Sequence, residues 1–227
     1  MTAVRMFLWL LPASRFKNQL LRLTGDVIGR RVHLGPTIVL GPVRFHLADG
    51  SSIGTLNLIR GLRLVRLDDD AFIGNLNQFT AAPEYRLADP TLGSVHLRRG
   101  AGIINRHYLD CSGRLEVGSM SMIAGIRSVL QTHGLDLQDN IARAGTIVIG
   151  ERTFTATGVV MVADSYLPDR SFLASGATRT RTDPGDPCGR LYAGTPARPV
   201  KDVSSWTWFT RTDIHTPVAP PRERGVI

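Results

Sequence analysis

His133 is the residue whose type and setting best suit chemistry. It stands in the stretch LQTHGLD, between a threonine and a glycine. An imidazole with an ordinary pKa of about 6.5 is mostly neutral at neutral pH, so it can take a proton from an attacking hydroxyl group. We therefore expect His133 to be a general base, and its alternative role is that of a histidine in a solvated loop.

Two aspartates and a second histidine are candidates to assist His133. Asp110 and Asp136 carry carboxylates that can orient an imidazole or bind a substrate hydroxyl, although aspartates in surface turns are common. His107 falls in an inward place of the repeat described below. A role in the site and a role as a buried, hydrogen-bonded histidine therefore both remain open for it.

A repeat of six residues provides the elements that must position these side chains. Read from Ile149, the sequence divides into IGERTF, TATGVV, MVADSY, LPDRSF and LASGAT. A large, mostly aliphatic residue comes first and a small one fifth. The fifth residue of one hexad and the first of the next are two apart, so they face the same side of a strand. The second to fourth places are rich in Gly, Asp, Ala and Pro, as tight corners require. Each hexad therefore predicts one short strand and one turn, which stack on copies of themselves.

The same rhythm runs from Ile28 onward, with two-residue resets and with predicted loops at about 81–94 and 131–148. If the frame continued from Val129, His133 would occupy an inward, small-residue place, where an imidazole fits poorly. We therefore expect the chain to leave the wall of the coil here and to present His133 in a cleft. A β-sandwich would show turn signals every 8 to 12 residues, so a period of six argues against it. Periodicity does not fix handedness, and the general rule favours right-handed crossovers.

Three stretches of the sequence resemble the hexapeptide-repeat acyltransferases, in particular the branch that O-acetylates sugars and polysaccharides. They are the hexads of 149–178, the segment 105–134, and the segment 191–203 with its GTPAR element. The resemblance implies an all-β fold, a left-handed parallel β-helix of hexapeptide repeats with an N-terminal helix and a C-terminal capping segment. The expected divisions are an N-terminal amphipathic helix at 1–27, the β-helix acyltransferase domain at 28–178, and a C-terminal loop, GTPAR element and tail at 179–227.

The resemblance also implies an activity, that of an acetyl-CoA-dependent O-acetyltransferase. Such an enzyme transfers the acetyl group directly to a sugar hydroxyl of a glycan, an exopolysaccharide or a nucleotide-sugar intermediate. His133 resembles the family's catalytic histidine, which also follows a threonine. His107 and Asp110, three residues apart, resemble a pair that lines the acceptor pocket, and Asp136 is a third candidate there.

The expected partners are a coenzyme A thioester, a sugar acceptor and two further copies of the chain. The family forms trimers that bind coenzyme A between subunits. We expect an exposed backbone amide at a glycine or alanine corner to stabilise the oxyanion. The residues expected to contact coenzyme A are Gly158, Ala174, Gly176, Gly194 and Arg198, and Arg179, Arg181 and Lys201 are further candidates for its phosphates.

The positive charge is concentrated at the amino-terminal end. The chain carries a net charge of +8, and residues 1–31 contribute +5 of it, with six basic residues against one acidic residue. This placement argues against a nucleic-acid partner. It suits either a helix that packs on the body of the fold or an amphipathic helix on an anionic membrane surface. The apolar run MFLWLL at 6–11 is too short for a signal peptide or a spanning helix, so we expect a cytoplasmic protein, with peripheral contact at the inner face of the membrane as an open alternative.

Two other functions remain open on the same fold. A zinc carbonic anhydrase would need histidines from adjacent turns, and His96, His107 and His133 are the candidates, although no histidine pair has the expected spacing of five. A non-catalytic scaffold or membrane-surface module would use the basic amino-terminal segment. We expect no metal, and we expect Cys111 and Cys188 to be reduced thiols, with Cys111 structural.

Overall fold

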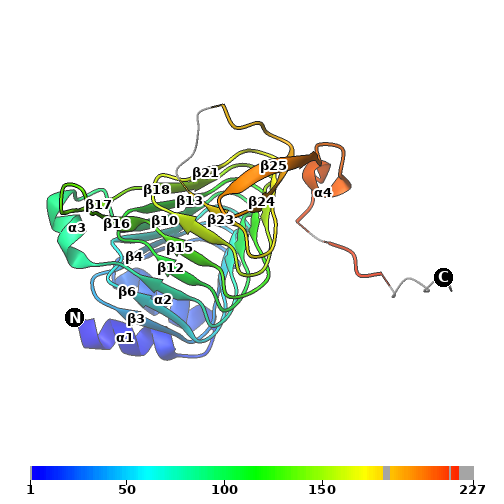
Figure 1. Ribbon diagram of the computed structural model, residues 1–227. Coiled ribbons are helices and arrows are strands. Elements are labelled where there is room, and N and C mark those ends of the chain that lie inside the picture. The colour runs from blue at the N-terminus through cyan, green and yellow to red at the C-terminus, as the bar shows by residue number, and fades with distance from the viewer. Residues whose placement is uncertain (1, 181–184, 215, 220–227) are drawn as a thin grey trace.

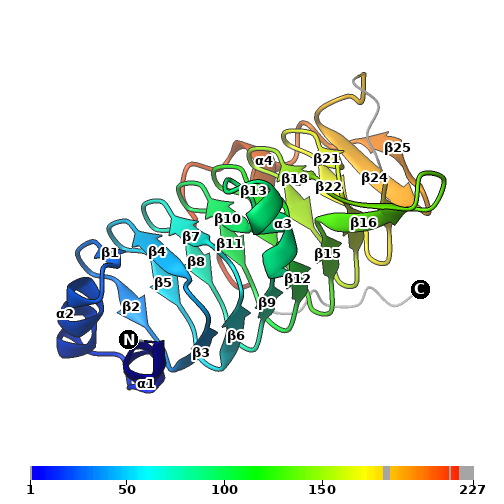
Figure 2. The same cartoon turned by 90° about the vertical axis from the view of Figure 1, so that its left-hand side faces the viewer.

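The chain winds into a solenoid whose coils each contribute one strand to each of three parallel sheets (Figures 1 and 2). The computed structural model describes residues 2–180, 185–214 and 216–219, so part of the predicted C-terminal segment, including Arg181, lies outside the described residues. The first sheet contains β1 (Val27–Ile28), β4 (Arg44–Leu47), β7 (Leu64–Leu67), β10 (Ser94–Leu97), β13 (Arg114–Val117), β18 (Thr146–Ile149) and β21 (Tyr166–Leu167).

The other two sheets repeat this arrangement. The second contains β2 (His33–Leu34), β5 (Ser52–Ile53), β8 (Phe72–Ile73), β11 (Gly102–Ile103), β14 (Met122–Ile123), β19 (Phe154–Thr155) and β22 (Phe172–Leu173), followed by β24 (Arg190–Gly194) and β25 (Ala197–Asp202). The third contains β3 (Thr37–Leu40), β6 (Asn57–Arg60), β9 (Gln78–Thr80), β12 (Tyr108–Asp110), β15 (Val129–Gln131), β20 (Val160–Val162) and β23 (Thr178–Arg179).

The register of the strands confirms the predicted parallel β-helix of hexads. Ile149 pairs with Leu167, which lies three hexads further along the chain. Leu67 pairs with Leu97, and Val117 with Ile149, because each of these coils carries an insertion. The first residues of the hexads are buried and stack into one continuous apolar core, which is how strands of two to four residues become stable.

Two helices, and not the single predicted one, cap the N-terminal end of the solenoid. They are α1 (Thr2–Leu10) and α2 (Arg15–Leu23), and α2 begins after Ser14, whose hydroxyl accepts the Lys17 N–H at 3.1 Å. Trp9 is buried against Phe45, with ring centroids 4.2 Å apart. The buried Lys17 ammonium donates to four backbone carbonyls, among them Trp9 O and Leu34 O. Both helices therefore pack on the body of the fold.

Both predicted loops leave the solenoid at the corner between the third and first sheets. The loop at 81–94 contains α3 (Pro83–Ala88), and the loop at 131–148 contains an antiparallel hairpin, β16 (His133–Asp136) with β17 (Ile141–Ala144). The two insertions project from the same edge of the solenoid (Figures 1 and 2). His133 thus leaves the wall as predicted, but it lies at the start of a strand. The inward residue of β15 is Leu130 and not Val129, so the predicted frame is wrong by one residue here.

The C-terminal segment covers the last coils. Strands β24 and β25 form a hairpin that extends the second sheet beyond β22. The short helix α4 (Thr207–Thr210) brings Trp208 within 5.2 Å of Phe154, between ring centroids. The aromatic tail therefore packs on the body of its own chain. Among the described residues, every helix is too short or too polar to cross a lipid bilayer.

Candidate active site

The centre of the candidate site is a contact between Asp110 and His133. Asp110 ends β12 and His133 follows β15, which is the next strand of the third sheet. The imidazole Nδ1 lies 2.7 Å from Asp110 Oδ2. The Asp110 side chain is 6% exposed and that of His133 is 33% exposed, so the carboxylate is covered while the ring stays accessible. A carboxylate can only accept, so Nδ1 carries the proton and Nε2 is left as the basic nitrogen.

Asp110 is held in place by the two chain segments beside it. Ser112 Oγ donates to its Oδ1 at 2.7 Å, and the backbone N–H of Thr132 donates to Oδ2 at 3.1 Å. The Thr132 hydroxyl in turn accepts the Gly113 N–H at 2.7 Å. These bonds tie the corner at Asp110 to the chain just before His133. They fix the carboxylate that orients the imidazole, which is the arrangement of a positioned general base.

Tyr85 is a residue of this site that the sequence analysis missed. It lies on α3, in the neighbouring insertion, and its ring contacts the imidazole of His133 with centroids 5.2 Å apart. Burial and the nearby Asp110 carboxylate raise the pKa of Tyr85. The sequence did carry a signal for Tyr85, because it is an aromatic residue in a loop that interrupts the hexads. The insertion that contains α3 therefore contacts the hairpin insertion at His133.

Asp136 does not take part in this arrangement. It lies at the end of β16, where its carboxylate accepts the Gln138 N–H at 3.1 Å and faces Arg143 Nε at 3.6 Å. It stabilises the turn of the hairpin. Of the two carboxylates expected as candidates to orient an imidazole, Asp110 makes the contact with His133, and Asp136 takes the alternative place of an aspartate in a turn.

His107 belongs to a series of inward polar side chains that each accept a backbone N–H of the next coil. Asn57 Oδ1 accepts the Asn77 N–H, Asn77 Oδ1 accepts the His107 N–H, and His107 Nδ1 accepts the Ser128 N–H at 3.2 Å. The His107 side chain is buried, and burial lowers its pKa to about 4. Its side chain is thus a structural element inside the coil and does not meet His133.

A surface hollow of about 580 Å³ begins above His107 and follows the outer face of the third sheet. Arg106 and Arg127 line it from consecutive coils, and the described lining residues include no acidic side chain. Tyr108 also lines it, and it points to the same side of β12 as Asp110 because the two are two residues apart. The hollow therefore lies at the start of β12, and Asp110 lies at the end of the same strand.

The residues predicted to contact coenzyme A fall mainly at the corner between the second and third sheets. Gly158 and Gly176 lie there on consecutive coils with φ of +68° and +69°, and no atom lies within 4 Å of the position of an added Cβ at either. The Thr195 hydroxyl donates to the Thr178 hydroxyl at 3.3 Å, which places the tip of the β24–β25 hairpin, with Gly194, beside this corner. We call Gly158, Gly176 and Gly194 the glycine row.

Two predictions about the binding of coenzyme A need correction. The N–H groups of Gly158, Ala174 and Gly176 donate to backbone carbonyls, so these amides are not available to an oxyanion. Arg179 is buried and pairs with Asp186, so it does not face a ligand. Arg198 lies exposed on β25, as a contact with a phosphate would require.

The described histidines do not converge on a metal. His96 pairs with Asp68 at 3.0 Å, His107 lies inside the coil, and His133 pairs with Asp110. Within residues 2–180, 185–214 and 216–219, no group of three His, Cys, Asp or Glu side chains could hold a metal ion. Cys111 is buried, and burial raises the pKa of its thiol, which makes it a poor nucleophile.

The comparisons with known proteins rest on structure. The sequence matches no protein-family model and is significantly similar to no curated protein. A solved structure of a point mutant of AntD, an N-acyltransferase from Bacillus cereus, in complex with dTDP and coenzyme A, is similar with a TM-score of 0.54 and 11% identity. That match covers 85% of this chain and 91% of AntD.

Two further matches have lower scores. The polysialic acid O-acetyltransferase OatWY has a TM-score of 0.48 and 14% identity, over 80% of this chain and 90% of that one. A hexapeptide-repeat containing acetyltransferase from Vibrio cholerae has a TM-score of 0.44 and 14% identity, over 89% and 88%. On the AntD match and its own strand order, the chain has the left-handed parallel β-helix fold of the hexapeptide-repeat acyltransferases.

Proposed function

We propose that the protein is an acetyl-CoA-dependent O-acetyltransferase that acts on a sugar hydroxyl. The observation that carries the proposal is the 2.7 Å contact between Asp110 and the accessible imidazole of His133, between two insertions. A hydroxyl is a weak nucleophile and needs a base to take its proton. An imidazole oriented by a buried carboxylate supplies that base.

The transfer proceeds in one displacement at the thioester. His133 Nε2 takes the proton of the sugar hydroxyl while the oxygen of that hydroxyl attacks the carbonyl carbon of the acetyl thioester. The carbon–sulfur bond then breaks, the acetyl group remains on the sugar oxygen as an ester, and the proton passes from His133 to the leaving sulfur. Asp110 stabilises the imidazolium that exists between these two proton transfers. The buried Cys111 takes no part.

Acetyl-CoA enters as a substrate and would lie along the glycine row. The open space at Gly158 and Gly176 fits an extended pantetheine arm, which needs close approach to backbone. Arg198 would contact a phosphate at the nucleotide end. AntD was crystallised with coenzyme A, and its structure is similar to this one over 85% of this chain.

The hollow with Arg106 and Arg127 suits an acceptor that carries negative charge. Two cations on consecutive coils, with no acidic residue among the described lining residues, favour a phosphate or carboxylate between them. The hollow opens at the start of β12, at the corner that also carries the glycine row, and Asp110 lies at the other end of this strand. A sugar attached to the bound anionic group would reach His133 by extending along the outer face of β12. A nucleotide sugar or an acidic glycan has this chemistry.

A homotrimer would complete the site. In one chain the glycine row and the Asp110–His133 pair lie at opposite ends of the third-sheet strands, because β15 runs from one corner to the other. Contact between the glycine row of one subunit and the insertions of a neighbour would bring donor and base together. This arrangement agrees with the family resemblance, in which coenzyme A binds between subunits.

The test is transfer from acetyl-CoA to a panel of nucleotide sugars and acidic glycan fragments, followed by coenzyme A release and mass spectrometry of the products. We expect an O-acetyl ester, which mild base removes. A base-stable product on amino sugars alone would assign N-acyl transfer instead. Failure of calorimetry to detect binding of acetyl-CoA or longer acyl-CoAs would overturn the proposal.

A further inference from the structure

Helix α1 presents an apolar stripe to solvent. Val4, Phe7 and Leu10 are 64%, 70% and 42% exposed, and their spacing of three places them on one side of the helix. The opposite side packs on the solenoid through the buried Trp9. A helix that is apolar on both sides is unusual at a water-exposed surface.

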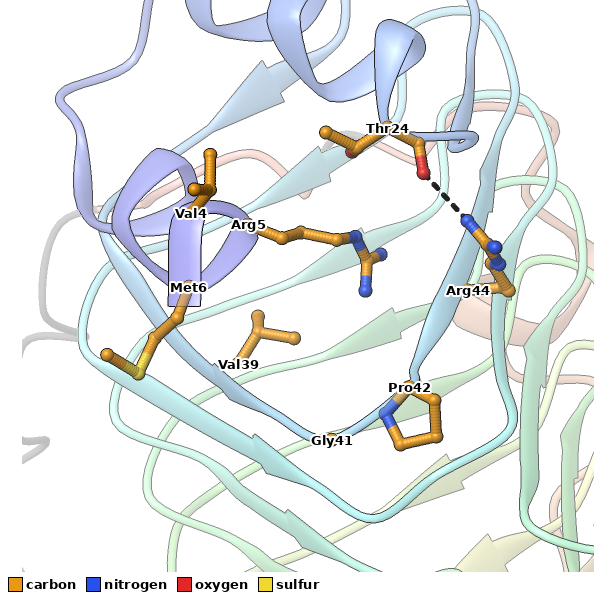
Figure 3. Close-up of a pocket in the computed structure, with 8 residues that line it drawn as sticks. All are labelled: Val4, Arg5, Met6, Thr24, Val39, Gly41, Pro42 and Arg44. Carbon is orange, nitrogen blue, oxygen red and sulfur yellow. Dashed lines mark hydrogen bonds between the residues drawn. The ribbon is translucent and has the colours of Figure 1, made fainter. Parts of the chain in front are cut away.

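The single charge of α1 is turned inward. Arg5 Nη2 donates to the buried Asp26 at 2.6 Å. Figure 3 shows Arg5 pointing from α1 into a cavity of about 340 Å³, toward Val39 and Arg44. The outward stripe is therefore left without a charged side chain of its own helix.

Helix α2 continues the apolar surface at the same end of the molecule. Phe16 and Leu23 are 63% and 84% exposed, and they lie two helical turns apart on its outer side. Figure 2 shows α1 and α2 together at the end of the solenoid where β1, β2 and β3 begin. We call the outer surface of these two helices, with the groove described next, the N-terminal cap.

A basic groove borders α2. It has a volume of about 490 Å³, and four arginines line it together with His33: Arg15, Arg22, Arg30 and Arg31. The described lining residues include no acidic side chain. The Arg22 guanidinium donates to Ile28 O and Gly29 O, and the nearby Asp49 accepts the backbone N–H of Arg30. The groove therefore offers a concentrated positive charge to a ligand with several phosphates or other anions.

We propose that the N-terminal cap binds the surface of a membrane that contains anionic lipids. Apolar side chains such as Phe7 and Leu23 would enter the interface, and the basic groove would contact the headgroups. A soluble phosphate compound would leave the apolar stripes unexplained. A second copy of the chain would place two sets of four arginines against each other. The proposal does not rest on the proposed acetyl transfer.

The experiment is sedimentation of the full chain with vesicles of phosphatidylcholine alone and of phosphatidylcholine with phosphatidylglycerol. We expect binding to the anionic vesicles only, weakened by salt. The substitutions Phe7→Ser and Leu23→Ser together, and Arg30→Gln and Arg31→Gln together, should each weaken binding about tenfold or more. The thermal unfolding midpoint of each variant serves as the check that it folds.

Matched substitutions elsewhere control for loss of apolar area and of charge. Val218→Ser changes a side chain that is 97% exposed in the tail, and Arg60→Gln with Arg99→Gln removes two exposed charges from other parts of the surface. These should leave vesicle binding unchanged. Equal binding to neutral vesicles, no binding, or equal weakening by the controls would each contradict the proposal. So would dissociation of an oligomer by Phe7→Ser without any vesicle binding, since the cap would then be a subunit interface.

Discussion

The Asp110 carboxylate and the His133 imidazole come from consecutive coils of the solenoid and meet at 2.7 Å. The meeting is possible because the corner at Asp110 is short, while the chain just beyond Thr132 leaves the wall as a hairpin. One side chain therefore stays anchored in the coil and the other is free to reach a substrate. This is the relationship from which the proposed chemistry follows.

Replacing Asp110 with asparagine should lower kcat by about 10²–10⁴-fold. The amide can turn its NH2 group toward Nδ1, and it carries no negative charge to stabilise the imidazolium. The pH profile of kcat should change as well, while the Kd of acetyl-CoA stays within about twofold. Asp136→Asn is the matched control, since Asp136 only stabilises a turn. A control variant as slow as Asp110→Asn would contradict the assignment.

Tyr85 should act through the packing of its ring. Tyr85→Ala removes the contact with His133 and should lower kcat/KM by up to about tenfold, the amount that an aromatic pair contributes. Tyr85→Phe keeps the ring and should behave like the wild type. If the phenylalanine variant is as slow as the alanine variant, the hydroxyl is needed, and the packing role is excluded.

His107 should make stability depend on pH. Its pKa is about 4 in the folded state, below the ordinary value of about 6.5 that holds in the unfolded chain, so between these values the unfolded state binds more protons. The free energy of unfolding should therefore fall as the pH drops from about 6.5 to 4, by about 2–3 kcal/mol for this residue.

The variant His107→Asn tests this, because Asn57 and Asn77 occupy the equivalent places of the two preceding coils. Urea denaturation of both proteins at pH 7 and at pH 4.5 gives the difference due to the imidazole. The variant should lose less stability on acidification than the wild type. Equal losses would show that His107 is not buried in its neutral form.

Arg106 and Arg127 should affect the binding of the acceptor and not the binding of acetyl-CoA. Replacing both with alanine should raise the KM of an anionic acceptor about tenfold or more, since charge-assisted hydrogen bonds are lost. Calorimetry should give an unchanged Kd for acetyl-CoA. A weakened affinity for acetyl-CoA with an unchanged acceptor KM would assign the hollow to the donor instead.

The solenoid was predictable because its cause is local. Residues two apart face one side of a strand, so a period of six repeats the same inward pair, and the register of Ile149 with Leu167 reproduces three hexads. The exit of the chain near His133 was predicted because the hexad frame ends there, but the reason based on Val129 was wrong. The inward residue of β15 is Leu130, which pairs with Leu109, and the buried His107 shows that an inward place can hold an imidazole. Asp110 was among the carboxylates expected to orient His133.

What was not predictable depends on contacts between distant segments. Tyr85 meets His133 through packing of two insertions that follow no repeat. Asp110 and Asp136 looked equivalent in sequence, and only the fold buries one of them against the imidazole. The break between the two N-terminal helices did have a local signal, Pro12 followed by the cap residue Ser14, and the prediction of one helix at 1–27 did not use it.

Turnover by His133→Ala, with binding of acetyl-CoA measured on the same preparation, shows most directly whether His133 is the general base. His46→Gln is the matched control, because His46 is exposed on the first sheet. We expect His133→Ala to slow transfer by about 10²-fold or more while the Kd of acetyl-CoA is unchanged and the control remains active. Undiminished turnover by His133→Ala would show that His133 is not the base.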